Sequence, residues 1–226
     1  MYSAIILAGG SGSRMKQSIP KQFLALAGKP IILHTLERLE KIDAIDEVVI
    51  VCHPQYKEML NFYIESYMLK KKYLVVDGGE TRQKSAYNGL IAASNENVII
   101  HEAARPFVTA QEFQALIDDE AENAFYGIEI PFTVLMRDQD HISGLLNRDQ
   151  LVNVQLPQKF NKATILAAHE LAAKEGLVFT EDASMVHYIG KPVKVLEGTV
   201  NNIKITNAID LLLGETIYKE YIVGRN

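Results

Sequence analysis

The sequence predicts an α/β fold: a mostly parallel sheet that is flanked by helices and carries a protruding β arm. Short apolar runs rich in β-branched residues alternate with amphipathic stretches along residues 4–130. Strands that alternate with helices pair in parallel through right-handed crossovers. The alternation then stops, and residues 133–155 contain two strand-like runs around a polar turn. No linker, repeat or low-complexity run divides the chain, so we expect residues 1–226 to form a single domain.

The expected elements follow the chain in order. The strands of the sheet are predicted at residues 4–7, 47–52, 73–76, 97–100 and 127–130. The helices between them are predicted at residues 30–41, 55–68, 81–94 and 110–123. Beyond the arm we expect a helix at 162–175, a short helix from 180, strands at 192–196 and 202–206, and a last helix from Asn207 to Tyr218. In such Rossmann-like sheets, ligands bind beyond the carboxyl ends of the strands.

The arm at residues 133–155 has strand-like runs at 133–137 and 149–155. An extended arm exposes strand edges, and exposed edges are covered in stable proteins. We therefore expect a second copy of the chain to cover the arm, which makes the protein a homodimer.

Composition excludes several classes of protein. The net charge of −5 argues against nucleic-acid binding, which needs a basic surface. No apolar run is long enough to span a membrane, and the apolar run near the N-terminus is too short for a signal peptide. A single cysteine, Cys52, leaves no disulfide framework, and the six histidines show no metal-site spacing. We expect a cytoplasmic protein that acts on neither nucleic acid nor membrane.

The first strand ends in a glycine-rich loop that is typical of phosphate binding. Gly9, Gly10 and Gly12 allow the backbone to approach a ligand, and successive N–H groups in such a loop attract anions. Arg14 and Lys21 follow and can neutralise phosphate charge. The loop lacks both the Walker pattern and the third glycine of the dinucleotide pattern. It therefore predicts a different nucleoside-triphosphate site.

Two further loops end strands at the same edge of the sheet. Gly78 and Gly79 precede a helix that Thr81 can cap. Glu102 and Arg105 follow the fourth strand. From the residues alone, Glu102 is either a ligand of a hard cation or the partner of Arg105 in an ion pair.

Seven stretches also resemble, in order and spacing, the sugar- and polyol-phosphate cytidylyltransferases. That family includes the ribitol 5-phosphate and 2-C-methyl-D-erythritol 4-phosphate enzymes. The stretches are L-A-G-G-S-G-S-R-M at 7–15, P-K-Q at 20–22, G-G-x-x-R-x-x-S at 78–85, H-x-A-A-R-P at 101–106, N-R…L-P-Q-K-F at 147–160, T-x-D-A-S at 180–184 and E-G…N-I-K-I-T at 197–206. The resemblance implies a nucleotide-diphospho-sugar transferase type of fold. It also implies transfer of a cytidylyl group from CTP to a polyol phosphate, with release of pyrophosphate.

The resemblance also implies a role for individual residues. The residues implied in catalysis are Arg14, Lys21, Arg148 and Lys204. The residues implied in CTP binding are Leu7, Ala8, Gly9, Gly10, Ser11, Gly12, Arg14, Lys21, Gly78, Gly79, Glu80, Ser85, Glu102 and Ala103. The residues implied in acceptor binding are Arg105, Arg148, Thr180 and Lys204. Glu102 would be a ligand of Mg²⁺, and Arg148 would reach the site from the arm of the neighbouring subunit.

The chain departs from the family pattern in ways that bear on the acceptor. Glu102 replaces the usual Asp, and Asn201 replaces a frequent acid. Leu135 stands where the methylerythritol enzymes have a threonine that faces the acceptor, and leucine cannot pair with a polyol oxygen. We therefore expect ribitol 5-phosphate as acceptor and CDP-ribitol, a precursor of cell-wall or capsule polymers, as product.

Three alternatives stay open. The protein is a 2-C-methyl-D-erythritol 4-phosphate cytidylyltransferase of isoprenoid precursor synthesis, or it is a nucleotidyltransferase that uses another base or a sugar 1-phosphate. The third alternative is a non-catalytic nucleotide-binding homologue, which the two changed acids would explain.

Overall fold

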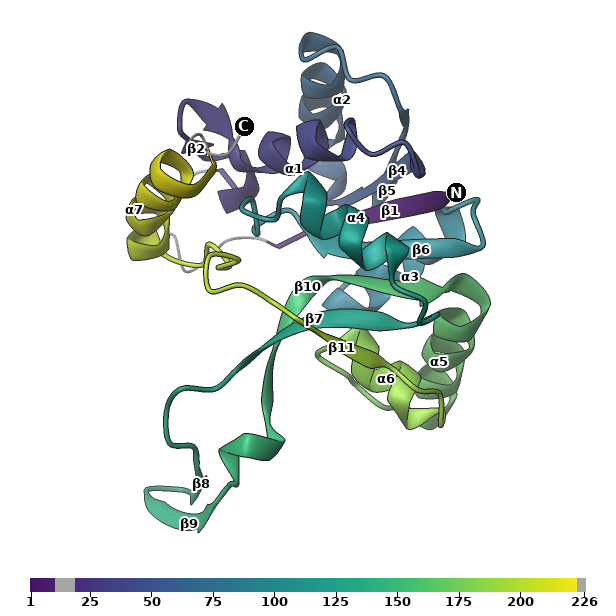
Figure 1. The fold of residues 1–226 in the computed structure, drawn as a ribbon. Helices are drawn as coiled ribbons and strands as arrows, with labels where there is room; N and C mark the ends of the chain where they lie inside the picture. The colour runs from purple at the N-terminus through teal and green to yellow at the C-terminus, as the bar shows by residue number, and fades with distance from the viewer. Residues whose placement is uncertain (11–18, 223–226) are drawn as a thin grey trace.

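A computed structural model describes residues 1–10 and 19–222 of the chain. Among these residues the main sheet has seven strands in the order β11–β7–β10–β6–β1–β4–β5 (Figure 1). They are β1 (Tyr2–Ala8), β4 (Ile45–Cys52), β5 (Lys72–Asp77), β6 (Asn97–Glu102), β7 (Ala124–Glu129), β10 (Val152–Asn161) and β11 (Lys194–Glu197). Only β10 runs against the others, since it pairs antiparallel with both β6 and β7. The sheet is therefore mostly parallel, as the sequence predicts.

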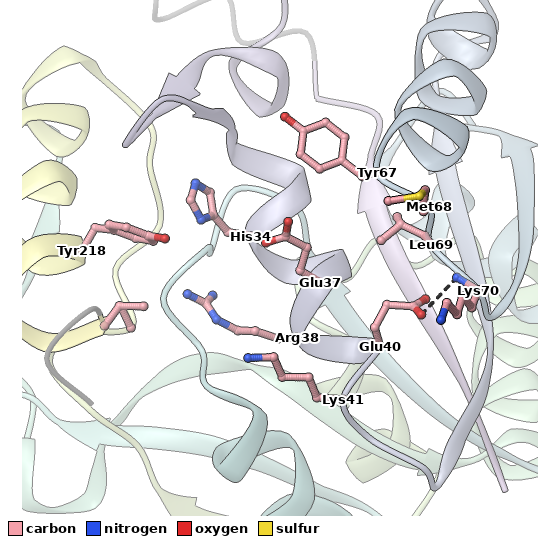
Figure 2. Close-up of a pocket in the computed structure, with 11 residues that line it drawn as sticks. His34, Glu37, Arg38, Glu40, Lys41, Tyr67, Met68, Leu69, Lys70 and Tyr218 are labelled. Atoms are coloured by element: carbon pink, nitrogen blue, oxygen red, sulfur yellow. Dashed lines mark hydrogen bonds between the residues drawn. The ribbon is translucent and has the colours of Figure 1, made fainter. Parts of the chain in front are cut away.

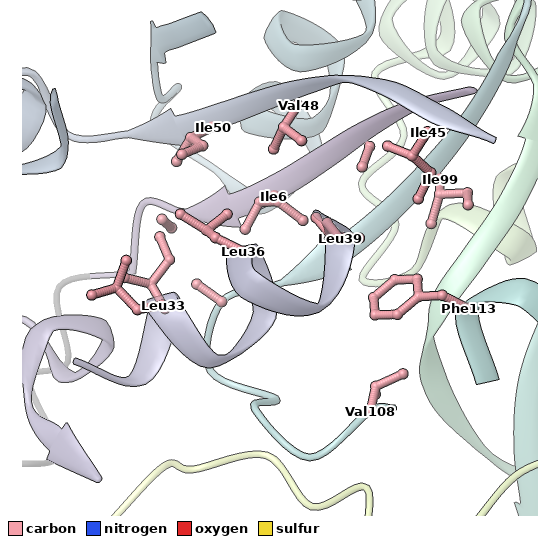
Figure 3. Close-up of a cluster of buried hydrophobic side chains, with 14 of the residues drawn as sticks. Ile6, Leu33, Leu36, Leu39, Ile45, Val48, Ile50, Ile99, Val108 and Phe113 are labelled. Atoms are coloured by element: carbon pink, nitrogen blue, oxygen red, sulfur yellow. The ribbon is translucent and has the colours of Figure 1, made fainter. Parts of the chain in front are cut away.

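Helices cover both faces of this sheet. On one face lie α1 (Ile31–Leu39), α2 (Lys57–Ser66) and α4 (Ala110–Asp118), and on the other lie α3 (Arg82–Ala92), α5 (Lys162–Glu175) and α6 (Asp182–Tyr188). The alternation of side chains along a strand explains the two layers, because Ile6 packs with the first set of helices and Ile5 with the second. Figure 3 shows Leu36 and Leu39 of α1 packed beside Ile6.

A smaller hydrophobic cluster attaches the C-terminal helix to the body. In it, Leu26 of the short hairpin β2 (Ala25–Leu26) and β3 (Lys29–Pro30) packs with Phe107 and Ile205 beneath α7 (Ala208–Ile217). Asn207 caps α7 in a reciprocal capping box with Asp210, as the sequence predicts. This cluster fixes the segment before α7, which carries Lys204, against the loop that follows β6.

The arm leaves the body between β7 and β10 (Figure 1). Its tip is the hairpin of β8 (Leu135–Asp138) and β9 (His141–Leu145), and the 3-10 turn η4 (Arg148–Gln150) leads back to β10. Apolar side chains of the tip are exposed: Leu135 48%, Met136 50%, Ile142 71% and Leu145 71%. Coverage of this surface by a second subunit stays a prediction.

Several expected boundaries are wrong. Residues 202–206 form no strand, because their backbone contacts loops: the Ile205 N–H donates to the Ala104 carbonyl. Residues 149–155 are only partly extended, and β10 continues through Pro157 to Asn161 inside the main sheet. Helix α4 ends at Asp118. A turn begins there, in which Asp119 Oδ1 accepts a hydrogen bond from the Ala121 N–H. The strand predicted at 127–130 begins earlier, at Ala124.

A buried carboxylate ties the opposite edge of the sheet together. Glu47 is 1% exposed and accepts hydrogen bonds from Ser3 Oγ at 2.5 Å, Lys72 Nζ at 2.5 Å and the Ser94 N–H at 2.7 Å. Burial alone would raise its pKa, but the bonds from Lys72, Ser3 and Ser94 outweigh burial and lower the pKa to about 2. The ionised form therefore belongs to the folded state.

Glu47→Gln should lower the free energy of unfolding by about 2 kcal/mol at neutral pH, because it replaces a buried, ionised acceptor of hydrogen bonds from Ser3, Lys72 and Ser94 with a neutral amide. The pKa of Glu47 is lower in the folded chain than in the unfolded chain. Its contribution is thus present above about pH 4.5 and is lost as the pH falls through the folded value. Denaturant unfolding of both proteins across acidic pH measures this. Equal stabilities at neutral pH, or a loss matched by the exposed control Glu65→Gln, would contradict it.

Candidate active site

A cleft of about 450 Å³ opens at the carboxyl ends of β1 and β6. It is lined by Leu7, Ala8, Gly9, Gly10, Lys21, Gln22, Gly79, Glu80, Thr81, Arg82, Ser85, Glu102, Ala103, Ala104 and Lys204. These residues come from five separate stretches of the chain. This is the position where open parallel sheets bind their ligands.

The loop after β5 presents backbone to the cleft. The Gly79 N–H donates to Ser85 Oγ at 3.0 Å, and Ser85 Oγ donates to the Thr81 carbonyl at 2.9 Å. Thr81 caps α3 by accepting from the Lys84 N–H at 3.1 Å. A Cβ on Gly79 would lie 2.4 Å from Lys84 Cγ and 3.0 Å from the Lys84 carbonyl carbon. The close turn therefore needs glycine, and it aims the start of α3 at the cleft, where helix N–H groups favour anions.

Two contacts fix the other side of the cleft. Gln22 is 3% exposed, and its Nε2 donates to the Ala8 carbonyl at 2.5 Å. Its neighbour Lys21 donates from Nζ to the Ile205 carbonyl at 2.8 Å. These bonds hold the 3-10 turn η2 (Lys21–Phe23) against the end of β1 and against the segment of Lys204.

Glu102, at the end of β6, gathers three cations. Lys204 Nζ lies 2.8 Å from its carboxylate, Arg82 Nε 3.3 Å and Arg105 Nε 3.6 Å. Burial would raise the pKa of Glu102, but Lys204, Arg82 and Arg105 lower it to about 2. The carboxylate is therefore ionised throughout the physiological range, and the cleft lining carries three cations, Lys21, Arg82 and Lys204, against the carboxylates of Glu80 and Glu102.

Arg82 links this cluster to a second one under α6. Its Nη1 lies 2.8 Å from the fully buried Asp182, and its Nη2 lies 3.7 Å from Glu181. Burial would lower the pKa of Arg82, yet Asp182, Glu181 and Glu102 together raise it. His169 Nε2 lies 3.5 Å from the other oxygen of Asp182. Arg82 is thus always charged, and its contacts with Asp182 and Glu181 fix the orientation of its guanidinium.

The structure brings together most of the residues expected to bind CTP. Gly78 does not line the cleft, because its N–H donates to the Cys52 carbonyl at 2.7 Å. Ser11, Gly12 and Arg14 lie outside the described residues.

The residues expected to bind the acceptor are less concentrated. Lys204 lines the cleft, and Arg105 lies behind Glu102, where it donates to the Asn202 carbonyl at 2.9 Å. Thr180 is exposed and is not a lining residue. Arg148 is on the arm, where it donates to the Pro131 carbonyl at 3.1 Å, and it does not line the cleft of its own chain.

Three polar lining side chains, Gln22, Thr81 and Arg82, were not among the predicted site residues, and neither was Ala104. Arg82 and Gln22 stand inside the quoted motifs G-G-x-x-R-x-x-S and P-K-Q, so a signal for both was present. Thr81 was expected only as a helix cap. Asp182 also stood in a motif, but its pairing with Arg82 depends on the packing of α3 and α6 against α5 and has no local signal.

Comparison with known proteins decides between the open alternatives. Residues 2–220 match the family model for 2-C-methyl-D-erythritol 4-phosphate cytidylyltransferase. The chain belongs to this family. It is 40% identical over 222 residues to the enzyme of that name from Geobacillus kaustophilus, with 96% of each chain covered. It also resembles the crystal structure of 4-diphosphocytidyl-2C-methyl-D-erythritol synthase from Anaerococcus prevotii, with a TM-score of 0.86, 28% identity, and coverage of 97% of this chain and 96% of that one.

The chain is therefore a nucleotidyltransferase of the cytidylyltransferase kind. The α/β fold expected from the resemblance is confirmed by the match to a solved structure of the family. None of the helices that the structure describes is long and apolar enough to cross a membrane.

The expectation of ribitol 5-phosphate as acceptor is wrong. The family model and the curated relatives carry the name of the 2-C-methyl-D-erythritol 4-phosphate enzyme instead. We expected ribitol 5-phosphate in part because Leu135 would face the acceptor. The structure places Leu135 in β8 at the tip of the arm, 48% exposed and away from the cleft of its own chain.

Lys21→Ala should lower kcat/KM by about a hundredfold or more, about 3 kcal/mol, which is typical for loss of one preorganised charge that faces the reacting group. Pyrophosphate release under steady-state conditions measures this. The fold should persist, because Lys21 is in a cleft and not in the core. The matched control is Lys174→Ala at the exposed end of α5. Near-normal turnover of Lys21→Ala would exclude Lys21 from catalysis.

Proposed function

We propose that the protein transfers the cytidylyl group of CTP to 2-C-methyl-D-erythritol 4-phosphate. An oxygen of the acceptor phosphate attacks the α-phosphorus of CTP, and the bond from that phosphorus to the bridging oxygen of the β-phosphate breaks. The products are the cytidine 5′-diphosphate ester of 2-C-methyl-D-erythritol and pyrophosphate. The observation that carries the proposal is the family match over residues 2–220, together with a cationic cleft at the expected edge of the sheet.

The chemistry needs charge neutralisation and alignment more than proton transfer. Lys21 and the backbone of Gly9 and Gly10 lie on the β1 side of the cleft and are suited to the triphosphate. Lys204 and Arg82 lie around Glu102 and are suited to the second anionic reactant. Two highly charged phosphates can approach each other only where fixed cations offset their repulsion.

His101 is unsuited to general acid–base chemistry in this site. It is fully buried beside Glu102, and its Nε2 donates to the Arg105 carbonyl at 3.1 Å. Burial lowers its pKa to about 3, so it is neutral at physiological pH. Its contact instead positions the loop of Arg105.

The acceptor is tested by comparing kcat/KM for 2-C-methyl-D-erythritol 4-phosphate and for ribitol 5-phosphate, each with CTP and magnesium, in a pyrophosphate assay. We expect at least a tenfold preference for the methylerythritol phosphate, because polar groups that fit one polyol are left unpaired by another. A reaction blank without acceptor measures hydrolysis. An equal or reversed preference would contradict the proposed acceptor, and no pyrophosphate with either would contradict catalysis.

We also propose that Glu102 is a ligand of Mg²⁺ when CTP binds. Its carboxylate is the kind of oxygen ligand that Mg²⁺ takes, and the described residues contain no cluster of three metal-ligating side chains that would hold an ion by itself. Phosphate oxygens and water would complete the coordination. Bound Mg²⁺ would supply charge neutralisation to the phosphates. Glu102 would then exchange part of its contact with Lys204 for the ion.

Glu102→Gln should raise the Mg²⁺ concentration needed for half-maximal turnover, because the variant loses an anionic ligand. The matched control is Glu181→Gln, which removes another carboxylate that faces Arg82 but does not line the cleft. Magnesium titrations of initial rate on all three proteins measure the effect. An unchanged titration for Glu102→Gln would favour the purely structural role of an ion pair with Lys204, Arg82 and Arg105.

We propose further that the protein works as a homodimer in which Arg148 completes the partner's site. Arg148 is 53% exposed in its side chain and has only the Pro131 carbonyl and a distant Asp149 as partners among the described residues. It lies on an arm whose tip exposes Leu135, Met136 and Ile142. If the arm docks on another copy of the chain, its exposed apolar tip is covered and Arg148 can contact the partner's site.

The shared site is tested by mixing two inactive variants, Arg148→Ala and Lys21→Ala. If each site draws Lys21 from one chain and Arg148 from the other, a mixed dimer contains one intact site. Random exchange should then restore about a quarter of wild-type activity. Subunit exchange is verified with two differently tagged chains. Absence of recovery in exchanged mixtures, or a monomer in sedimentation, would contradict the shared site.

A further inference from the structure

A second depression, of about 510 Å³, lies outside the cleft and shares no lining residue with it. Its floor is the outer face of α1, and its walls are the turn after α2 and the segment that follows α7 (Figure 2). It is lined by His34, Glu37, Arg38, Glu40, Lys41, Tyr67, Met68, Leu69, Lys70, Tyr218 and Ile222. We call it the α1 groove. Its volume is in the range of small-molecule sites.

Arg38 is the unusual residue of the α1 groove. It is partly buried, and its Nη1 donates to the Pro106 carbonyl. Arg82 and Arg105, the two other partly buried arginines that the structure describes, both have carboxylates within 4.0 Å, whereas no described carboxylate comes that close to Arg38. A partly buried cation that no carboxylate contacts directly is incompletely compensated. Burial lowers the pKa of Arg38 to about 10, which leaves it charged at physiological pH.

The carboxylates nearest to the groove are already engaged. Glu37 pairs with Lys29 at 2.5 Å. Glu40 accepts from the Lys70 N–H at 3.0 Å and from the Tyr73 hydroxyl at 2.7 Å, so its carboxylate is turned toward the turn after α2 and away from Arg38 (Figure 2). Among the described residues, the carboxylates of Glu37 and Glu112 favour the charged form of Arg38 only from a distance, and neither forms an ion pair with it.

Lys41 and Lys70 add two exposed ammonium groups to the lining of the groove. Figure 2 shows Arg38 and Lys41 extending from α1 to the same side, toward Tyr218. His34 adds no charge, because burial lowers its pKa and its Nε2 donates to the Leu26 carbonyl at 2.8 Å. The groove is thus cationic on one side and aromatic above it, where the rings of His34 and Tyr218 meet edge to face at 4.8 Å.

We propose that the α1 groove is a second ligand site, and that it binds a small organic molecule with a phosphate group. The guanidinium of Arg38 presents a fork of donors that matches phosphate oxygens, and its contact with Pro106 holds it in place before binding. Lys41, which extends from α1 to the same side as Arg38, supplies further positive charge (Figure 2). Tyr218 and Tyr67 offer flat apolar surface to the organic part of the ligand.

The probe for this site is phenyl phosphate, titrated calorimetrically into the intact protein. We expect Arg38→Gln to weaken its binding by at least about tenfold, because the variant removes the bidentate charged donor. Arg137→Gln removes the same charge from the exposed arm and should leave the affinity unchanged. Equal affinities for wild type and Arg38→Gln, or an equal loss with Arg137→Gln, would overturn the proposal.

A second variant guards against misfolding, since Arg38 also contacts Pro106. Lys41→Gln alters only an exposed side chain and should still weaken binding severalfold. If this variant binds phenyl phosphate like the wild type, the proposal fails.

Three further probes define the ligand. Phenol should not bind, and benzoate and inorganic phosphate should each bind at least tenfold more weakly than phenyl phosphate. Benzoate binding as tightly would overturn the preference for phosphate. Inorganic phosphate binding as tightly would overturn the role of an organic part. Amide shifts in NMR spectra with phenyl phosphate should concentrate at residues 67–70 and 218–222, and shifts confined to residues 8–10 would instead place the ligand in the catalytic cleft.

Discussion

The carboxylate of Glu102 is the constraint on which the catalytic cleft depends. Three cations from separate parts of the chain converge on it: Arg82 from α3, Arg105 from the following loop and Lys204 from the segment before α7. Without the carboxylate, these cations would repel one another in a poorly solvated space. With it, the cleft keeps a net positive charge and a fixed shape. A ligand with several negative charges then meets cations that need little reorganisation.

The fold could be predicted largely from local signals, because buried parallel strands need continuous β-branched runs and helices need a 3.6-residue period. β4 and α5 follow such runs closely. Residues 202–206 do not follow these local signals. Their alternating pattern is strand-like, yet their backbone groups bond to Ala104, Lys21 and Arg105. Alternation reports which side chains are buried, but it does not report whether a neighbouring strand exists.

Some residues of the site could likewise be predicted from local sequence, and others could not. Glycines and cations that follow a strand could be recognised as a phosphate site because they lie close together in sequence, as Gly9, Gly10 and Lys21 do. Arg82 and Asp182 are far apart in sequence, so only the packed structure reveals that one fixes the other. The error about Leu135 arose from assigning a cleft position to a residue on the arm. The sequence of a protruding arm cannot show which chain's cleft the arm serves.

Strand β10, the one antiparallel strand of the main sheet, connects the arm to the cleft. Its first half leaves the body as part of the arm, and its second half pairs with β6, the strand that ends in Glu102. At its middle the Leu156 carbonyl accepts a bond from Asn202 Nδ2 at 2.6 Å, two residues before Lys204. A change in the position of the arm would therefore act on β10, the strand whose Leu156 carbonyl holds the segment that carries Lys204. An arm that binds another subunit would thus stabilise the cleft of its own chain as well as serve the cleft of its partner.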